Sequence, residues 1–271
     1  MNSRMQGFER DTLRAVLNGK HVWLIHAVVN ALVMVAFFYW TQIPDETGWQ
    51  FTLTLFAGLI IALVTLWLHT ATFAYFSPAS GRRFTTALRQ SWSRVPAFLF
   101  WVLIFSIVLW WIGGLWGHDE QGGGYARHLL PLAVRRSTSP RSMFSATHWL
   151  VWFLCFFAWP ILMLPLGGQV ATKNFRGFVS PAAFRPIREV RFWLAYLVCF
   201  LVGAYVPYTL AWMIPTKPST LGAQEWSMAL RLGFGYLLLV TAWVVLCAAI
   251  MRASGGEEAA VPESQLAPTV A

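Results

Sequence analysis

The strongest constraint on this chain is its division into six long apolar runs. An α-helix of about 20 mostly apolar residues crosses the hydrocarbon core of a bilayer and satisfies its own backbone hydrogen bonds there. Only 11% of the residues are charged, which is too few to cover the surface of a soluble domain. We predict an all-α, polytopic membrane protein whose six transmembrane helices span about residues 22–40, 49–76, 95–116, 147–170, 192–214 and 226–251.

These spans predict a single transmembrane domain over residues 1–252, followed by a tail. Residues 253–271 are rich in Ala, Gly, Glu and Pro without periodicity, so we predict that they are disordered. Pro160 and Pro165 lie within the fourth span and lack a backbone N–H, so we predict a kink or an irregular end there, and Pro207 lies within the fifth span. The three cysteines lie within apolar runs and are predicted to be buried and unreactive.

A short basic segment precedes the first, third and fifth spans. The clearest one is residues 84–94, in which Phe84, Ala87, Leu88 and Trp92 fall at helical spacing on one face. A basic amphipathic helix of this kind lies in the membrane interface. We predict three such interfacial helices, and their arginines are candidates for contacts with anionic lipid headgroups or a protein partner: Arg14, Arg82, Arg83, Arg89, Arg94, Arg185, Arg188 and Arg191.

The basic residues also predict the orientation of the spans. The formal net charge is +9, and most Lys and Arg residues precede spans one, three and five. Short basic segments stay on the cytoplasmic side, so we predict a bacterial inner-membrane protein with both termini in the cytoplasm. We expect anionic membrane lipids as partners and name a membrane protein or a second copy of the chain as a further candidate. No nucleic-acid-binding module is recognisable, and we predict no such partner.

The connection over residues 117–145 lies on the opposite side. It contains three successive glycines, Gly122 to Gly124, together with Arg135, Arg136 and Arg141. A long connection is translocated with little regard to its charge. We predict a flexible loop, of which residues 125–134 touch the interface. Its histidines lack the spacing of a metal site, so we predict no metal and no cofactor.

Polar side chains within the first two spans are the leading candidates for function, because polar groups are costly to place in a membrane. His26 and Asn30 lie one helical turn apart, and Thr65, His69 and Thr72 follow in the second span. Adjacent antiparallel spans place the two histidines at similar depth. This set suits a proton relay, a metal or haem ligand pair, or a polar ligand site. The alternative that we favour is plain hydrogen bonding between helices.

One short sequence supports a family resemblance. The basic segment Ala87-Leu88-Arg89-Gln90-Ser91-Trp92 before a hairpin resembles those of uncharacterised six-span bacterial membrane proteins. These are the YciC-like proteins and the membrane domain found beside some glycerophosphodiester phosphodiesterases. The resemblance covers spans two to six as a pattern, and the glycine-rich outer connection is not part of it. It implies a style of fold and no catalytic residues.

These observations favour a non-enzymatic integral membrane protein. We predict an accessory, scaffold or envelope-homeostasis role that acts through lipid and protein contacts. The first alternative is a transporter or permease subunit with a polar path near His26, Asn30 and His69. The second alternative is a membrane enzyme that acts on lipid-like substrates. The absence of acidic residues deep within any span weakens this alternative, and we lean against an enzyme.

Overall fold

The computed structural model describes residues 3–44, 46–77, 83–213 and 220–255. Within these ranges the chain forms helices and no strands. Six helical stretches are long and apolar enough to cross a membrane, which confirms the predicted all-α, polytopic architecture. The predicted disordered tail lies outside the described residues, apart from residues 253–255 at the end of the last helix.

The first half of the chain contains three of the six spans. The first basic segment is helical and ends at Gly19, which caps the next helix. A capping box starts the second span, because the Thr47 hydroxyl accepts from the Gln50 N–H and the Gln50 side chain accepts from the Thr47 N–H. In chain order the elements are α1 (Ser3–Asn18), α2 (Lys20–Trp40), α3 (Gly48–Phe76), α4 (Phe84–Ser91), η1 (Trp92–Arg94), α5 (Val95–Gly114) and η2 (Leu115–His118).

The second half supplies the other three spans, and here the third basic segment departs from an α-helix. Pro181 and Pro186 each lack an N–H, and the segment forms 3₁₀ turns. In chain order the elements are α6 (Asp119–Leu129), α7 (Leu132–Ser137), α8 (Pro140–Phe153), η3 (Leu154–Ala158), α9 (Trp159–Lys173), η4 (Asn174–Val179), η5 (Pro181–Phe184), η6 (Pro186–Arg188), α10 (Val190–Phe200), η7 (Leu201–Tyr205), α11 (Val206–Trp212) and α12 (Leu221–Gly255).

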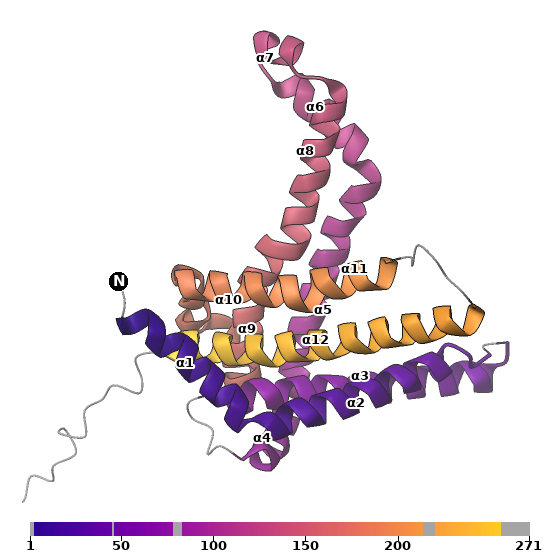
Figure 1. The fold of residues 1–271 in the computed structure, drawn as a ribbon, viewed down its shortest axis with the longest axis vertical. Coiled ribbons are helices and arrows are strands. Elements are labelled where there is room, and N and C mark those ends of the chain that lie inside the picture. The colour runs from indigo at the N-terminus through magenta and orange to yellow at the C-terminus, as the bar shows by residue number, and fades with distance from the viewer. Residues whose placement is uncertain (1–2, 45, 78–82, 214–219, 256–271) are drawn as a thin grey trace, which may run out of the picture.

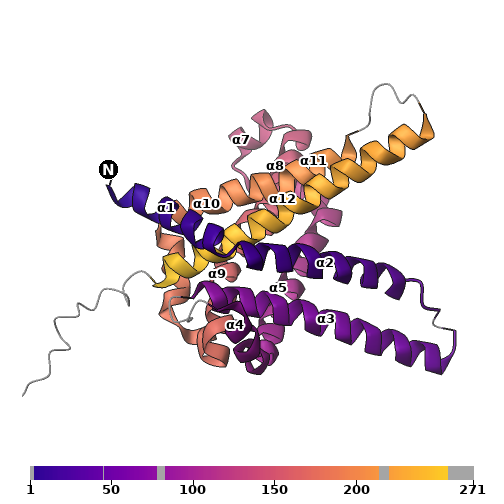
Figure 2. The same cartoon turned by 60° about the horizontal axis from the view of Figure 1, so that its bottom comes forward.

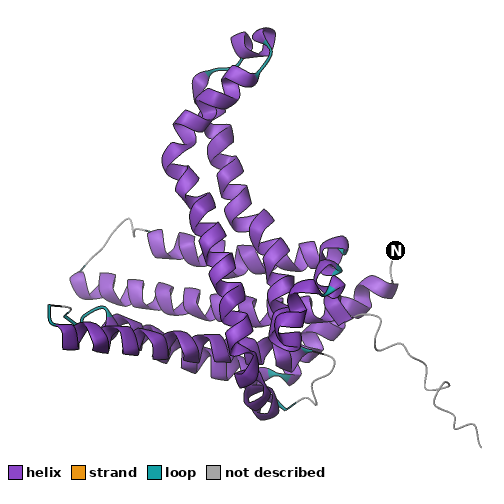
Figure 3. Cartoon of the chain, turned by 180° about the vertical axis from the view of Figure 1, so that it is seen from behind, coloured by secondary structure: helices purple, strands orange, loops and turns teal. Residues whose placement is uncertain are grey.

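The spans form two groups that diverge from a common base. In one group α2, α3, α12 and the α10–α11 helix run side by side (Figure 1). In the other group α5 and α8 form a hairpin that leaves the base at a steep inclination, with α6 and α7 at its far end. The view from behind shows the same divergence (Figure 3). The start of α1, the end of α12, α4 and α9 all lie at the base (Figure 2).

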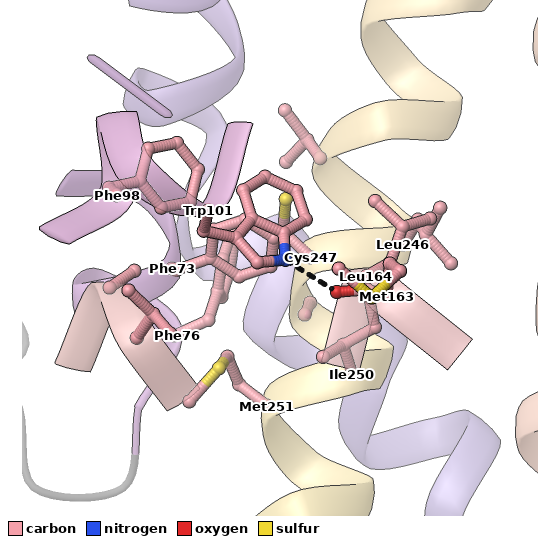
Figure 4. Packing of buried hydrophobic residues seen from close by; sticks show 14 of the residues in the cluster. Phe73, Phe76, Phe98, Trp101, Met163, Leu164, Leu246, Cys247, Ile250 and Met251 are labelled. Atoms are coloured by element: carbon pink, nitrogen blue, oxygen red, sulfur yellow. Dashed lines mark hydrogen bonds between the residues drawn. The ribbon is translucent and has the colours of Figure 1, made fainter. Parts of the chain in front are cut away.

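The hydrophobic core is concentrated at this base. All buried residues of α3 lie between Leu66 and Phe76, and the main cluster draws on α3, α5, α9, α10 and α12. Figure 4 shows Phe73, Trp101 and Ile250 from three of these helices packed together. Away from the base, large apolar side chains are exposed along most spans, as lipid-facing residues are. The base therefore supplies most of the tertiary packing.

Glycines allow the helices to meet closely at two points of this core. A Cβ atom on Gly167 of α9 would lie 2.6 Å from the indole of Trp101 in α5. A Cβ atom on Gly203 of η7 would lie 2.4 Å from the Cβ atom of Ala242 in α12. Lipid tails are as apolar as leucine side chains, so close packing of small residues is a main source of helix association in membranes.

Tryptophan N–H groups add hydrogen bonds between the same helices. Trp101 of α5 donates to the Met163 carbonyl of α9 over 3.0 Å, and Figure 4 shows this bond. In return, Trp159 of α9 donates to the Phe105 carbonyl of α5, also over 3.0 Å. These reciprocal bonds fix the crossing of α5 and α9, because a buried indole N–H is costly to leave without a partner.

The irregularity predicted for the fourth span is present as a π-helical turn, η3, which ends two residues before Pro160. A second π turn, η7, ends two residues before Pro207 in the fifth span. Pro160 has no N–H to donate to the carbonyl of Phe156, four residues earlier. The Tyr196 hydroxyl of α10 donates to that carbonyl instead. The π turn is therefore also a point of contact between two spans.

The prediction of a flexible loop over residues 117–145 is wrong, because α6, α7 and the start of α8 occupy it. Gly123 lies against α8, where a Cβ atom would be 3.0 Å from the backbone of Phe144. The glycines thus permit helix packing in place of chain freedom. Arg127 donates to the carbonyls of Thr138 and Arg135, over 3.2 Å each, and ties the segment together. The helical stretch of the fourth span accordingly begins at residue 140 and not at 147.

Candidate functional site

The structure brings four of the five polar candidates of the first hairpin together. His26 is fully buried, and its Nε2 lies 2.5 Å from the Thr72 hydroxyl. That hydroxyl already donates to the Leu68 carbonyl over 2.9 Å, so it accepts from His26. The Nδ1 of His26 therefore accepts from the Asn30 amide, 3.2 Å away. This assignment gives a neutral histidine with both ring nitrogens occupied.

His69 lies beside this group. Its ring centroid is 5.3 Å from that of His26 and 5.1 Å from that of Trp243 in α12. Its Nδ1 is a buried atom without a hydrogen-bond partner among the described residues. Thr65, the fifth candidate, bonds within its own helix, to the Ile61 carbonyl. The first hairpin thus presents a connected group that joins α2, α3 and α12.

The chemistry open to this group follows from its bonds. With both nitrogens engaged, His26 has no lone pair available for a metal ion or a transferred proton. Two pockets in the described part of the chain, one at the base and one beside α6, are lined by none of His26, Asn30 and His69. Among the described residues no set of three His, Cys, Asp or Glu side chains is placed to hold a metal ion. The polar path remains a prediction, and the geometry itself supports helix association.

The predicted arginines gather at the base, on the elements that precede the odd-numbered spans. α1, α4 and the end of α12 lie at this end of the molecule (Figure 2). Most of these arginines are exposed, and Arg94 and Arg191 are half-buried. Arg82 lies outside the described residues. We call the remaining set the basic end, which consists of Arg14, Arg83, Arg89, Arg94, Arg185, Arg188 and Arg191.

A pocket of about 290 Å³ opens within the basic end. Its wall is built from five segments: the ends of α3, α9 and α12, the α4–η1 helix, and η5 with the residues on either side of it. Three cationic side chains line it, and no Asp or Glu is among its described lining residues. The polar residues that matter for its chemistry are Arg94, Lys173, Arg185, Gln169, Ser180 and Ser254.

Several of these polar groups are buried. Lys173 donates to the Ser180 hydroxyl over 3.2 Å, and that hydroxyl donates to the Gln169 carbonyl oxygen over 3.3 Å. Gln169 and Ser254 are only 3% and 4% exposed. The Ser254 hydroxyl oxygen has no hydrogen-bond partner in the described structure. The pocket therefore combines positive charge with a buried polar group that is not satisfied internally.

The local backbone positions Lys173. The next residue, Asn174, has a positive φ of 58°, a conformation that L-residues rarely adopt, and it ends α9. Its side chain compensates, since Oδ1 accepts from the Phe175 N–H over 2.9 Å and Nδ2 reaches the Ser93 carbonyl at 3.5 Å. The turn after α9 is thus hydrogen-bonded to Ser93, the residue before Arg94. These bonds hold Lys173 and Arg94 on elements that face each other.

Sequence reasoning identified Arg94 and Arg185 but missed the other pocket residues. Lys173, Gln169 and Ser254 come from segments far apart in the chain, and helical periodicity gives no information about which helix ends meet. One signal was available: Gln169 is a polar residue near the end of an apolar span, where burial is costly without a role. The unusual polarity of that position could have directed attention to the end of α9.

Comparison of the chain with protein-family models, curated proteins and solved structures finds no significant match.

Proposed function

We propose that this protein is a non-enzymatic membrane protein of accessory or scaffold type that acts through contacts between its basic end and anionic lipid headgroups. We further propose that the basic end faces the cytoplasm of a bacterial inner membrane. The observation that carries the proposal is the gathering of exposed arginines from three separate segments at one end of six spans. Each Arg near an anionic membrane surface contributes about 1 kcal/mol to lipid attraction.

The packing of the spans supports a role in contact rather than in chemistry. His26 bonds to Thr72 and Asn30, and the Tyr196 hydroxyl donates to the Phe156 carbonyl in the π turn before Pro160. Exposed arginines and a buried hydroxyl without a partner in the described structure lie at the basic end. An accessory role in the envelope agrees with this distribution, and so does the resemblance to uncharacterised six-span proteins, which stays a prediction.

A lipid-selectivity experiment tests the main proposal. The protein is extracted from mixed vesicles of phosphatidylglycerol and phosphatidylethanolamine, and the lipids retained are counted by native mass spectrometry. Changing Arg89 and Arg188 to Gln should lower the preference for the anionic lipid by about 2 kcal/mol, or about 30-fold. The matched control changes Arg136 and Arg141, which are exposed at the opposite end. Equal losses in both double variants would contradict the proposal.

A labelling experiment tests the orientation. The three native cysteines are buried, so an exposed cysteine introduced by mutation is the main site open to a membrane-impermeant maleimide. Thr85→Cys places it on α4 and Gln121→Cys on α6, at opposite ends of the α5 span. In intact spheroplasts we expect labelling of the second variant only, and labelling of the first after lysis. The reverse pattern would place the basic end outside.

A further inference from the structure

We propose that the pocket between α3, α4–η1, α9, η5 and α12 is a binding site for a phosphate group carried by a headgroup-sized molecule. This inference rests on the proposed function and gives it a single, saturable site. Three observations carry it: the charge of the lining, an unsatisfied buried hydroxyl and the volume of the pocket.

The charge of the lining selects an anion. Arg94, Lys173 and Arg185 line the pocket and together carry three positive charges, and none of the described lining residues is an acid. Arg94 is half-buried, and one of its Nη atoms reaches the Ala171 carbonyl at 3.4 Å. Positive charges that line one pocket favour an anion as its occupant. A planar guanidinium and a compact ammonium are the side chains that most often bind phosphate oxygens.

The buried polar groups select an occupant that forms hydrogen bonds. Ser254 is one of the lining residues and is almost completely buried, and its hydroxyl oxygen has no partner among the described residues. Leaving such a group unpaired costs about 1–3 kcal/mol. Lys173 already gives one of its three protons to Ser180, and two remain for a ligand. A phosphate group has several acceptor oxygens and up to two negative charges, whereas a carboxylate has two oxygens and one charge.

The volume sets the size of the molecule. At about 290 Å³ the pocket lies at the lower end of the range for small-molecule sites, about 300–1,000 Å³. This space suits a phosphate with a small polar substituent and not a whole phospholipid. The pocket also lies at the end of α12, a helix of 35 residues that at 1.5 Å per residue is about 52 Å long. Because this exceeds the hydrocarbon core of about 30 Å, the ends of α12 reach the headgroup region.

The source of the phosphate is either a lipid headgroup or a soluble phosphate compound, and titration separates them. The protein is purified in a maltoside detergent, which carries no phosphate, at about 150 mM salt to screen exposed charges. Inorganic phosphate, glycerol phosphate and dihexanoyl phosphatidic acid are titrated separately by calorimetry, with acetate as the carboxylate probe. We expect one-to-one binding of at least one phosphate probe. Binding of the lipid alone identifies a headgroup site, and binding of the soluble probes identifies a soluble ligand.

Three variants localise the site. Lys173→Gln and Arg94→Gln each remove one charge from the pocket, and we expect each to raise the dissociation constant about 10-fold or more. Arg176→Gln removes the same charge from an exposed residue of η4 that does not line the pocket, and it should leave the constant unchanged. The melting temperature without ligand is measured for every variant, and Ser254→Ala provides a fourth, uncharged test with a smaller loss.

The pocket proposal is overturned if no phosphate probe binds one-to-one, if acetate binds as tightly, or if Arg176→Gln weakens binding as much as Lys173→Gln does. These outcomes leave the lipid-selectivity experiment untouched, because that experiment changes Arg89 and Arg188, outside the pocket. A protein that selects anionic lipids without a saturable phosphate site would retain the proposed function and lose the pocket. A protein that binds phosphate at this site without a preference for anionic lipids would retain the pocket and lose the proposed function.

Discussion

Replacing Tyr196 with phenylalanine removes one hydroxyl group from the interior and preserves the ring and its packing. This hydroxyl donates to the carbonyl of Phe156, which cannot accept from residue 160 because that residue is proline. The substitution therefore removes the donor that stands in for the missing N–H. Loss of a hydrogen bond costs about 0.5–1.5 kcal/mol in general, and bonds between transmembrane helices average about 0.6 kcal/mol with a maximum of about 1.7. We expect Tyr196→Phe to cost about 1 kcal/mol.

The second arm of this prediction restores the missing donor. Pro160→Ala returns an N–H to the position that serves the Phe156 carbonyl in a regular α-helix. In that background a backbone N–H is available to replace the tyrosine hydroxyl, and we expect Tyr196→Phe to cost close to nothing. The two substitutions should show a coupling energy of about 1 kcal/mol in a double-mutant cycle.

The measurement is reversible unfolding in mixed micelles, with the free energy of unfolding obtained by linear extrapolation. Tyr208→Phe is the matched control, because Tyr208 is an exposed tyrosine on the same span, and its change should stay within about 0.5 kcal/mol. An equal cost of Tyr196→Phe in both backgrounds would show that proline does not create the need for the hydroxyl. No cost in the original background would show that the bond contributes nothing.

Three further changes test the packing of the spans, each by the same unfolding measurement. Gly203→Val should cost about 1–3 kcal/mol by overpacking against Ala242, and Ala242→Gly should recover part of the loss; no recovery would refute the contact. His26→Leu should cost about 1 kcal/mol or more, because two partners lose their bonds, and an unchanged stability would refute their role. Ile250→Ala in the core should cost about 2 kcal/mol or more, whereas Ile107→Ala on a lipid-facing surface should cost almost nothing; equal costs would refute the concentration of packing at the base.

The apolar runs of the sequence predicted the spans well, because the thickness of the bilayer fixes the length of each run. The second span was predicted over residues 49–76 and is α3, Gly48–Phe76. The third was predicted to begin at residue 95 and α5 does begin at Val95. The fourth begins earlier than predicted, because residues 140–146 include Arg141, Ser142 and Ser145, and hydropathy does not register a helix that continues into a mixed segment.

The polar group of the first hairpin was only partly readable from the sequence. The spacing of His26 and Asn30 fixes their shared face, and the antiparallel order of spans places His69 nearby, as the structure has it. The direction of each hydrogen bond was not readable, because it depends on whether Thr72 already donates elsewhere. The contact of His69 with Trp243 joins the second and sixth spans, which no local pattern relates.

The residues that determine tertiary structure here are the exceptions to the apolar pattern. A leucine facing lipid and a leucine facing another helix have nearly the same environment, so hydrophobicity cannot tell them apart. Gly167 and Trp101 identify a helix contact, because the glycine has no side chain at the place that the indole occupies, and the indole N–H donates to the Met163 carbonyl. The same reasoning applies at the basic end: Gln169 and Ser254 are buried polar residues in apolar helices, and their positions point to the pocket. In a membrane sequence, the small, indole-bearing and polar residues therefore carry the information about which helices meet and where a ligand fits.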